Sequence, residues 1–383
     1  PGPHSYTGED CAEIHCHGSP VVLDEVLAAA FARGARQARG GEFTQRAFLS
    51  GRMDLIQAES VADLIDAESA GAARNAVGQL QGRMSRSVGG IYDALMDVVS
   101  RFYAIVDYPD EEIEPLQQAQ IEQTLAESAE RLDALLATFS RGRLLKSGVP
   151  AVILGKPNAG KSSLLNALLG YDRAIVTDIA GTTRDTVEEK VLVGSVLLRL
   201  CDTAGIRDAA DTVERLGVER AQQAAQRAEL ALLVLDGSAP LTREDEEAIA
   251  AARRARRMLV LVNKADLPQV LDTAALRVRF GEVIPLSARS GAGVDALCRA
   301  VEELFAGGET PRGELLTNAR QAESTQRALD AVRRAEQALR SGLSPDAVLT
   351  DAEEALEALA EFSGKRVRDD LVATIFSRFC VGK

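Results

Sequence analysis

A strand-like run, a glycine-bracketed loop and a helix-like run follow one another in residues 151–169, and this order constrains the fold more than any other feature. The loop reads Gly155-Lys-Pro-Asn-Ala-Gly160-Lys161-Ser162. Its glycines let backbone N–H groups close around a phosphate at a helix N-terminus, where the helix dipole favours anions. Lys161 would bring positive charge to β- and γ-phosphates, and the Ser162 hydroxyl would bind Mg²⁺. The pattern therefore predicts a strand–loop–helix unit that binds a nucleoside triphosphate.

Short apolar runs alternate with helical stretches from Gly148 onward. Alternation of this kind is typical of βαβ units around a parallel sheet. The turn-forming pair Gly194-Ser195 lies between two apolar runs, residues 187–193 and 196–201, so we expect an antiparallel hairpin at one edge of the sheet. The expected strands are residues 151–154, 187–193, 196–201, 230–235, 258–262 and 283–286.

Three polar motifs follow the expected strands at their carboxyl ends, where ligands bind in open α/β sheets. In Asp202-Thr-Ala-Gly205, the aspartate suits a water-mediated hold on Mg²⁺ and Gly205 a backbone contact with a γ-phosphate. In Asn263-Lys264-Ala-Asp266, the Asp266 carboxylate can accept two hydrogen bonds that guanine offers and adenine does not. Ser287-Ala288-Arg289 would close the base pocket. Together these motifs indicate GTP rather than ATP.

The stretch Thr177-Asp-Ile-Ala-Gly-Thr182-Thr183-Arg-Asp185 lies between the loop and Asp202. A threonine here can bind Mg²⁺ when the γ-phosphate is present, so we assign Thr183 as a phosphate sensor. A polar turn before the hairpin is the alternative. The predicted Mg²⁺ ligands are Ser162 and Thr183. The predicted GTP-binding residues are Asn158, Ala159, Gly160, Lys161, Ser162, Ser163, Thr177, Asp178, Ile179, Ala180, Gly181, Thr182, Thr183, Asp202, Thr203, Ala204, Gly205, Asn263, Lys264, Asp266, Ser287, Ala288 and Arg289.

The residue after Asp-x-x-Gly is Ile206, where small Ras-like GTPases place a glutamine that orients the attacking water. An aliphatic side chain cannot orient water. The charged segment 207–220 offers Glu214 for this task, although charged residues that open a helix are also typical of a solvated face. The catalytic residues predicted from these motifs are Lys161, Thr183 and Asp202, and Glu214 stays an open candidate for orienting water.

Helical patterns flank this region on both sides. Apolar residues recur at three-and-four spacing in residues 55–65 and 121–136, and residues 311–383 are helical by pattern. Neither flank is long enough for a generous core of its own, so we expect residues 51–147 and 311–383 to pack together. Residues 1–50 read as a short α+β piece, with a strand over residues 11–17 and a helix over residues 21–33.

These patterns predict a multidomain fold, α/β plus all-α. A P-loop (Ras-like) GTPase domain is inserted in a helical domain, and a partial α+β N-terminal domain precedes both. The predicted domains are residues 1–50 for the N-terminal part, 51–147 and 307–383 for the two parts of the helical domain, and 148–306 for the GTPase domain.

Composition excludes several other classes of protein. A chain of 383 residues suits two or three domains, and a first residue of Pro1 suggests a fragment. No run approaches the ~20 apolar residues of a membrane span, and no signal segment opens the chain. Five scattered cysteines form no disulfide framework, which favours the cytoplasm. The formal charge of −13 weighs against a broad nucleic-acid-binding surface.

The phosphate loop, the sensor stretch and Asp202-Thr-Ala-Gly205 together resemble the MnmE (TrmE) family of tRNA-modification GTPases. The terminal Cys380-Val-Gly-Lys383 resembles that family's Cys-x-Gly-Lys ending. Near the start, Tyr6-Thr-Gly-Glu-Asp10 and Gly41-Glu-Phe-Thr-Gln-Arg-Ala-Phe48 are similar to the family's N-terminal domain, whose opening part this chain lacks. The resemblance therefore runs in order along the whole chain.

This resemblance implies a GTPase that K⁺ activates. The family's potassium ligands correspond to Asn158, Thr177, Ile179 and Thr182. A K⁺ ion near the β- and γ-phosphates would stabilise transition-state charge much as an arginine finger does. The family glutamate that matches Glu214 is implicated in orienting water.

The resemblance also implies partners and a second ligand. The family forms homodimers whose GTPase domains pair on activation, and residues 1–50 correspond to part of its folate-binding and dimerisation domain. The residues that match its contacts to a tetrahydrofolate one-carbon derivative are Glu13, Arg52 and Lys383, although the family position of Arg52 is commonly lysine. With an MnmG-type partner that contains FAD, the family attaches an aminomethyl-type group at C5 of the wobble uridine in certain tRNAs.

Two other functions stay open at this point. An Era-like ribosome-assembly GTPase would need an RNA-binding domain with a Gly-x-x-Gly loop among strands, whereas residues 311–383 read as helices. A GTP-gated scaffold would only position a partner enzyme. The chain has no flavin or nicotinamide fingerprint, so the sequence does not separate that role from direct carbon chemistry. The role of Cys380 is open as well.

Overall fold

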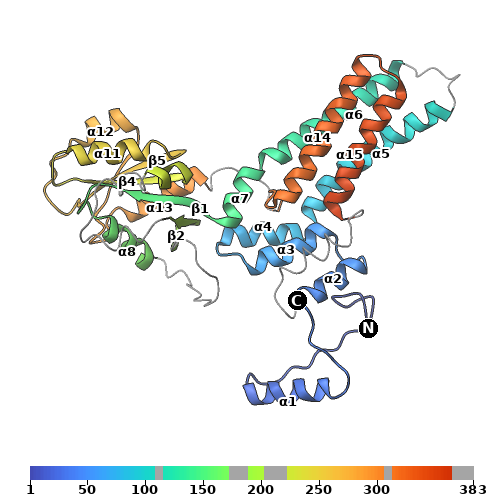
Figure 1. The fold of residues 1–383 in the computed structure, drawn as a ribbon, viewed down its shortest axis with the longest axis horizontal. Helices are drawn as coiled ribbons and strands as arrows, with labels where there is room; N and C mark the ends of the chain where they lie inside the picture. Colours follow the sequence, from blue (N-terminus) through green and yellow to red (C-terminus); the bar gives the residue numbers. More distant parts are fainter. Residues whose placement is uncertain (108–114, 172–188, 202–221, 306–312, 365–383) are drawn as a thin grey trace. The chain divides into compact units, whose positions relative to one another are not determined.

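The computed structural model describes residues 1–107, 115–171, 189–201, 222–305 and 313–364 (Figure 1). The helices are α1 (Pro20–Phe31), α2 (Glu42–Leu49), α3 (Leu55–Ile65), α4 (Ala70–Leu80), α5 (Arg83–Asp107), α6 (Pro115–Ala137), α7 (Phe139–Ser147), α8 (Lys161–Tyr171), α11 (Arg243–Ala252), α12 (Thr273–Phe280), α13 (Val294–Phe305), α14 (Ala319–Arg340) and α15 (Pro345–Ser363). The strands are β1 (Val149–Leu154), β2 (Glu189–Val193), β3 (Val196–Leu200), β4 (Leu230–Asp236), β5 (Arg257–Asn263) and β6 (Val283–Pro285).

The described residues fall into two compact units, which we call the helical unit and the sheet unit. The helical unit takes its residues from Pro1–Ala67, Ala72–Gly142 and Thr310–Lys383. The sheet unit takes them from Glu68–Gly71 and Arg143–Glu309. The helical unit is therefore built from chain that lies on both sides of the sheet unit in the sequence. Among the described helices, not one combines the length and the apolar character that a membrane span requires.

The sheet unit contains one mixed sheet with the strand order β2-β3-β1-β4-β5-β6. β1, β3, β4, β5 and β6 pair in parallel, and β2 pairs with β3 antiparallel, with Val193 opposite Val196 across the Gly194-Ser195 turn. Gly194 adopts a φ of 61°, which favours glycine at the tight turn. The hairpin that the sequence predicts at one edge is therefore present.

Helices cover both faces of this sheet (Figure 1). α8 and α13 bury apolar side chains against one face, and α11 and α12 bury theirs against the other. All seven residues of the central strand β4 are buried, as is typical of a parallel strand covered on both sides. The parallel arrangement brings the carboxyl ends of β1, β4, β5 and β6 to the same edge.

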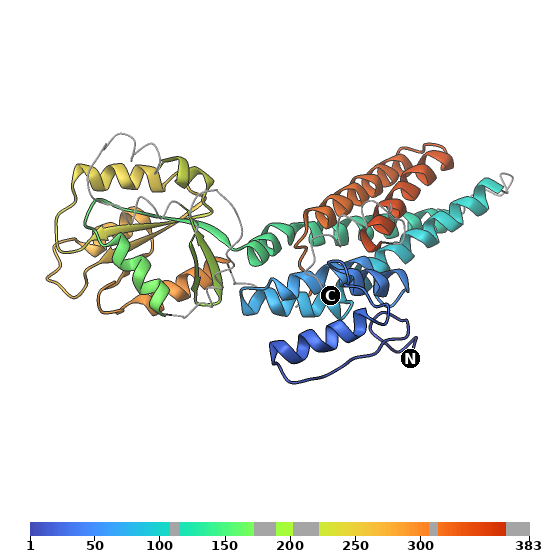
Figure 2. The same ribbon diagram turned by 60° about the horizontal axis from the view of Figure 1, so that its bottom comes forward.

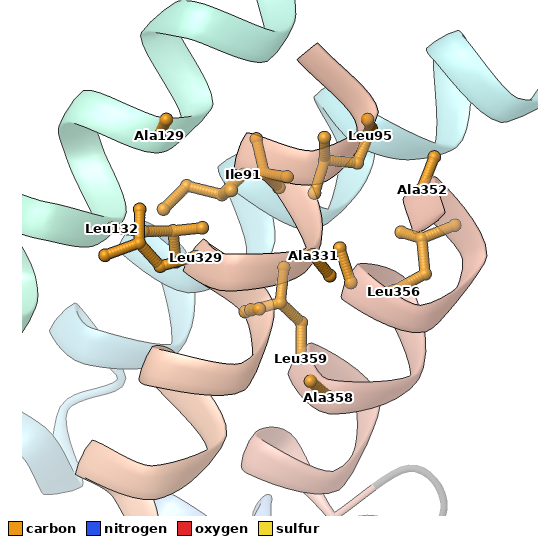
Figure 3. Packing of buried hydrophobic residues seen from close by; sticks show 14 of the residues in the cluster. Ile91, Leu95, Ala129, Leu132, Leu329, Ala331, Ala352, Leu356, Ala358 and Leu359 are labelled. Atoms are coloured by element: carbon orange, nitrogen blue, oxygen red, sulfur yellow. The ribbon is translucent and has the colours of Figure 1, made fainter. Parts of the chain in front are cut away.

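The helical unit has one apolar core shared by α5, α6, α14 and α15 (Figure 3). α14 and α15, in orange and red, run side by side in both views (Figures 1 and 2). The stripe predicted along α6 is buried in this core, with Ile121, Leu125 and Leu132 at most 1% exposed. Helices separated by about 200 residues thus share one core, because each has an apolar stripe to remove from water.

The chain that re-enters the helical unit is held by side chains that precede the sheet unit. Gln79 Nε2 donates a 2.7 Å hydrogen bond to the Leu315 carbonyl oxygen. Gly142, the last residue before the chain enters the sheet unit, lies against Leu316, and a Cβ on this glycine would stand 2.0 Å from the Leu316 carbonyl oxygen. The absence of a side chain at Gly142 therefore allows the outgoing and returning segments to pack together.

A buried ion pair joins α3 to the beginning of α14 and the end of α15. Arg320 Nε donates to Glu59 Oε1 at 2.9 Å, and the side chains are 17% and 7% exposed. Gln321 Nε2 donates to Glu59 Oε2, also at 2.9 Å. Arg320 Nη1 donates to the Glu361 carbonyl oxygen at 2.9 Å. Glu59 therefore neutralises the charge of Arg320, and Arg320 in turn donates to a carbonyl oxygen at the C-terminal end of α15.

The boundaries of α15 follow the sequence closely. The helix begins at Pro345 after Ser344 and ends at Ser363, before Gly364, whose φ of 84° is left-handed. Ser344 is the N-cap residue, although its side chain makes no capping hydrogen bond.

The strand predicted over residues 11–17 is not formed. These residues have no regular secondary structure, and the described part of residues 1–50 is helical only in α1 and α2. A strand is stabilised by hydrogen bonds to a neighbouring strand, and no described strand pairs with this run. Alternating polar and apolar residues alone could not supply that partner.

We predict that Glu59→Gln destabilises the helical unit by about 3 kcal/mol, because it leaves the Arg320 charge buried without its counter-ion. Urea denaturation followed by far-ultraviolet circular dichroism measures the change. Glu354→Gln is the control, since the Arg334–Glu354 pair is 47% and 48% exposed and solvent screens it to below about 1 kcal/mol. Equal shifts for the two variants would contradict the assignment.

Candidate nucleotide-binding site

The predicted phosphate loop connects the carboxyl end of β1 to the first residue of α8. It passes so close to the neighbouring strands that two of its glycines have no room for a side chain. A Cβ on Gly155 would stand 2.4 Å from the Val234 carbonyl oxygen, and a Cβ on Gly160 would stand 2.1 Å from Asn263 Nδ2. Gly160 also has a φ of 101°. Both glycines are therefore required by close approach.

Lys161 is the first residue of α8, and its ammonium group lies inside the loop. Lys161 Nζ donates to the carbonyl oxygens of Gly155 and Lys156, at 2.8 Å each. Burial disfavours the charged form and lowers the pKa of Lys161. An anion enclosed by the loop would offset that penalty. This position suits a lysine that pairs with phosphate oxygens.

The remaining loop residues lie around this lysine. Asn158 is exposed and has a left-handed φ of 60°, which asparagine tolerates better than most residues. Ala159 is fully buried, whereas Ser162 and Ser163 are exposed in the first turn of α8. The Ser162 hydroxyl at this helix N-terminus fits the predicted Mg²⁺ ligand in chemistry and position.

Asn263 ties this loop to a second motif. Its side chain is buried at the end of β5, where Nδ2 donates to the Ala159 carbonyl oxygen at 2.8 Å. Its Oδ1 accepts from the Ala288 amide at 2.9 Å. One amide side chain therefore connects the phosphate loop, the end of β5 and the segment after β6. The sequence assigned Asn263 to nucleotide binding, and in the structure both polar atoms of its side chain are bonded to Ala159 and Ala288.

Lys264 pairs with an aspartate that the sequence analysis did not select. Its backbone has a φ of 64°, and its Nζ donates to Asp236 Oδ2 at 2.6 Å. Burial raises the pKa of Asp236, but hydrogen bonds from Lys264 and Ser238 outweigh it, so that the pKa is lowered overall. Asp236 aligns with Asn263 between the parallel strands β4 and β5. Asp236 could have been found from the sequence as an acidic residue at the end of the expected strand that precedes the Asn-Lys-x-Asp strand.

The predicted guanine-reading residue, Asp266, is exposed beside the segment after β6. A hydrogen bond from Ser287, which is only 1% exposed, lowers the pKa of the Asp266 carboxyl group. The amide of Ala265 donates to the Leu286 carbonyl oxygen at 3.1 Å, which holds the two segments together. Arg289 is exposed next to them. The Asp266 carboxylate is therefore ionised and able to accept hydrogen bonds.

The structure thus brings three predicted motifs to one edge of the sheet: residues 158–163, Asn263 to Asp266, and Ser287 to Arg289. Several predicted residues lie outside the described part of the chain, and their positions stay predictions. These are Thr177, Asp178, Ile179, Ala180, Gly181, Thr182, Thr183, Asp202, Thr203, Ala204, Gly205, Glu214 and Lys383.

Two predicted folate contacts are described, and no contact in the structure joins them. Glu13 is exposed and lies 3.3 Å from His15 Nε2. Arg52 Nε donates to the Ser5 carbonyl oxygen at 3.1 Å. The assignment of Glu13 and Arg52 to a folate derivative therefore stays a prediction.

We predict that Asn263→Ala loosens both segments that its side chain connects. The Ala159 carbonyl oxygen and the Ala288 amide would each lose a buried hydrogen bond, at a cost of about 1–3 kcal/mol. Hydrogen–deuterium exchange should accelerate in residues 155–160 and in residues 287–292 together. Asn166→Ala, at an exposed position of α8, is the control. Acceleration in only one of the two segments would show that Asn263 does not connect them.

Comparison with known proteins places this chain in a family. A model of the MnmE helical domain matches residues 55–380, and a model of the GTP-binding protein TrmE N-terminus matches residues 1–52. The tRNA modification GTPase MnmE of Roseiflexus sp. (strain RS-1) is 45% identical over 394 residues, covering 100% of this chain and 84% of the relative. The protein of that name from Laribacter hongkongensis (strain HLHK9) is 45% identical over 390 residues, covering 100% and 85%.

The likeness to solved structures is weaker. The G domain of the T. maritima FeoB iron transporter is 23% identical with a TM-score of 0.31, and the match covers 42% of this chain and 99% of that one. A TM-score of this size supports no argument. The family models and the relatives, in contrast, cover both the helical unit and the sheet unit. This chain belongs to the family of the tRNA modification GTPase MnmE.

Proposed function

We propose that this chain binds GTP, hydrolyses it to GDP and phosphate, and acts in tRNA modification. The observation that carries the proposal is the meeting of Lys161, Asn263 and Asp266 at the carboxyl edge of one sheet. The relatives that match the whole chain are named tRNA modification GTPases, which supports the same activity.

In this proposal each described residue has a distinct task. Backbone N–H groups of the loop, apart from Pro157, which has none, and the Lys161 ammonium bind the phosphates. The Asp266 carboxylate accepts hydrogen bonds from the guanine edge, and a hydrogen bond from Ser287 lowers the pKa of that carboxyl group. Ser162, with Thr183, would hold Mg²⁺, which neutralises phosphate charge when bound. Thr183, Asp202 and Glu214 complete the proposed site, with Glu214 orienting the attacking water in place of a glutamine.

The potassium part of the proposal concerns Asn158, Thr177, Ile179 and Thr182. Asn158 is the described member, and its exposed side chain stands in the loop that would enclose the phosphates. A monovalent cation there supplies positive charge to the transition state. Ile206 stands where other GTPases have a glutamine, and its aliphatic side chain cannot stabilise the transition state. A cation in the loop would fill that role.

The wider proposal is a cytoplasmic homodimer that works with an MnmG-type, FAD-containing partner at C5 of the wobble uridine of certain tRNAs. Family membership supports it. The Era-like alternative is not favoured, because residues 319–363 form the long helices α14 and α15 and the relatives carry another name. The scaffold alternative is not favoured either, because the relatives are named tRNA modification GTPases. A tetrahydrofolate derivative held by Glu13, Arg52 and Lys383 is part of this wider proposal, and family membership supports it.

We predict that Asp266→Asn lowers GTP affinity by at least about 100-fold, since a carboxylate acceptor is replaced partly by an amide donor. Xanthosine triphosphate, which carries a carbonyl where guanine has its amino group, should bind the variant better than GTP does. Fluorescent nucleotide titration measures both. Asp272→Asn is the control, because an asparagine can still cap α12. Wild-type affinity for GTP in Asp266→Asn would end the guanine assignment.

We predict that replacing Na⁺ with K⁺ raises the GTP hydrolysis rate by about 100-fold, and that Asn158→Ala removes most of this gain. Phosphate release in the two salts at equal ionic strength measures the effect. Asn166→Ala should keep the full response to K⁺. Equal turnover in the two salts would sink the potassium mechanism and leave GTP binding untouched.

A further inference from the structure

A buried ion pair attaches the phosphate loop to α11, a helix on one face of the sheet. Lys156 Nζ lies 2.8 Å from Asp245 Oδ2. The two side chains are only 11% and 1% exposed. Surface ion pairs of this length are common and weak, but a pair withdrawn from water to this degree responds strongly to the loss of either member.

The carboxylate of this pair is held in a fixed place. Asp245 is the third residue of α11, and its Oδ2 also accepts from the Thr242 amide at 2.8 Å and from the Thr242 hydroxyl at 2.9 Å. α11 is packed on the sheet through Ile249 and Ala252, which are at most 2% exposed. Lys156 is therefore anchored to a rigid element.

Lys156 is linked at its other end to the phosphate-binding lysine. Its carbonyl oxygen accepts a 2.8 Å hydrogen bond from Lys161 Nζ. The side chain of Lys156 is thus fixed by Asp245 while its backbone contacts the ammonium group of Lys161. A displacement of Lys156 would move both this carbonyl group and the adjacent loop amides.

The pair is poorly explained as a device for stability. Asp245 Oδ1 is buried and accepts no hydrogen bond from any residue that the structure describes. Desolvating a carboxylate and leaving one oxygen unpaired costs free energy, and apolar replacements of buried ion pairs are often neutral or stabilising. A role in fixing one loop conformation accounts for a pair of this kind at this place.

We propose that Asp245 is a positioning residue for phosphate recognition, which acts through Lys156 to hold residues 155–160 in the shape that binds a nucleoside diphosphate or triphosphate. This inference rests on the proposed function. The loop contacts phosphates and not the base, so Asp245 affects GDP and GTP affinity alike and leaves the preference for guanine unchanged. It touches no reacting atom and acts only through Lys156, so its loss weakens the binding of both nucleotides.

The test compares neighbouring substitutions in the full-length chain. Asp245→Asn keeps the size of the side chain and removes its charge, and we expect the Kd of fluorescent GDP and GTP to rise about tenfold. Glu246→Gln is the matched control on the next residue of α11, where the carboxylate pairs with the exposed Arg279 instead. Its Kd should stay within about twofold of wild type. Equal Kd values for Asp245→Asn and wild type would overturn the inference.

A double-mutant cycle keeps the test valid if Asp245→Asn folds poorly. Lys156→Met with Asp245→Asn removes both charges, so no unpaired charge stays buried. We expect this double variant to bind as weakly as Lys156→Met alone, because either change breaks the same link. Lys156→Arg keeps the positive charge, so it should retain most of the GDP and GTP affinity that Lys156→Met loses. A folded double variant with wild-type Kd, or additive effects of the two changes, would overturn the role.

The outcome separates this inference from the proposed function. A wild-type chain that binds neither GDP nor GTP would refute the proposed function itself. A wild-type chain that binds both, together with an Asp245→Asn variant of equal affinity and normal folding, would refute only the positioning role.

Discussion

One buried amide side chain holds the candidate nucleotide site together. Asn263 donates to Ala159 in the phosphate loop and accepts from Ala288 after β6, although Ala159 lies 104 residues away in the sequence. The amide offers both a donor and an acceptor, whereas an ionised aspartate lacks the donor and leucine lacks both. The positions of Lys161 and Asp266 depend on this connection, because each belongs to a segment that Asn263 fixes.

The same kind of constraint appears in both units: buried polar groups decide how segments far apart in the sequence meet. In the sheet unit, Asp245 fixes Lys156 and thereby the phosphate loop. In the helical unit, Glu59 joins α3 to α14 through Arg320. Apolar cores supply most of the driving force in each unit, but they are not directional. Hydrogen-bonded ion pairs add direction, and they specify where each segment lies.

The sequence by itself determined the elements whose signals are local. The phosphate loop, the Gly194-Ser195 hairpin and the end of α15 before Gly364 follow from glycine conformations and chain spacing. The apolar stripes of the helical flanks likewise predicted buried faces, because a period of 3.6 residues places them on one side of a helix. Asp266 was predicted for a similar reason, because the spacing within Asn-Lys-x-Asp is itself the signal, and its role in guanine binding stays a prediction.

Tertiary structure alone decided the partners of these elements. Residues 11–17 alternate like a strand, yet they form none, because no described strand pairs with them. The pairs of Lys264 with Asp236 and of Lys156 with Asp245 could not be predicted either. Each depends on which strand end or helix start lies next to the phosphate loop. That neighbourhood is set by the order of strands in the sheet and by the face each helix covers, which residue spacing along the chain does not encode.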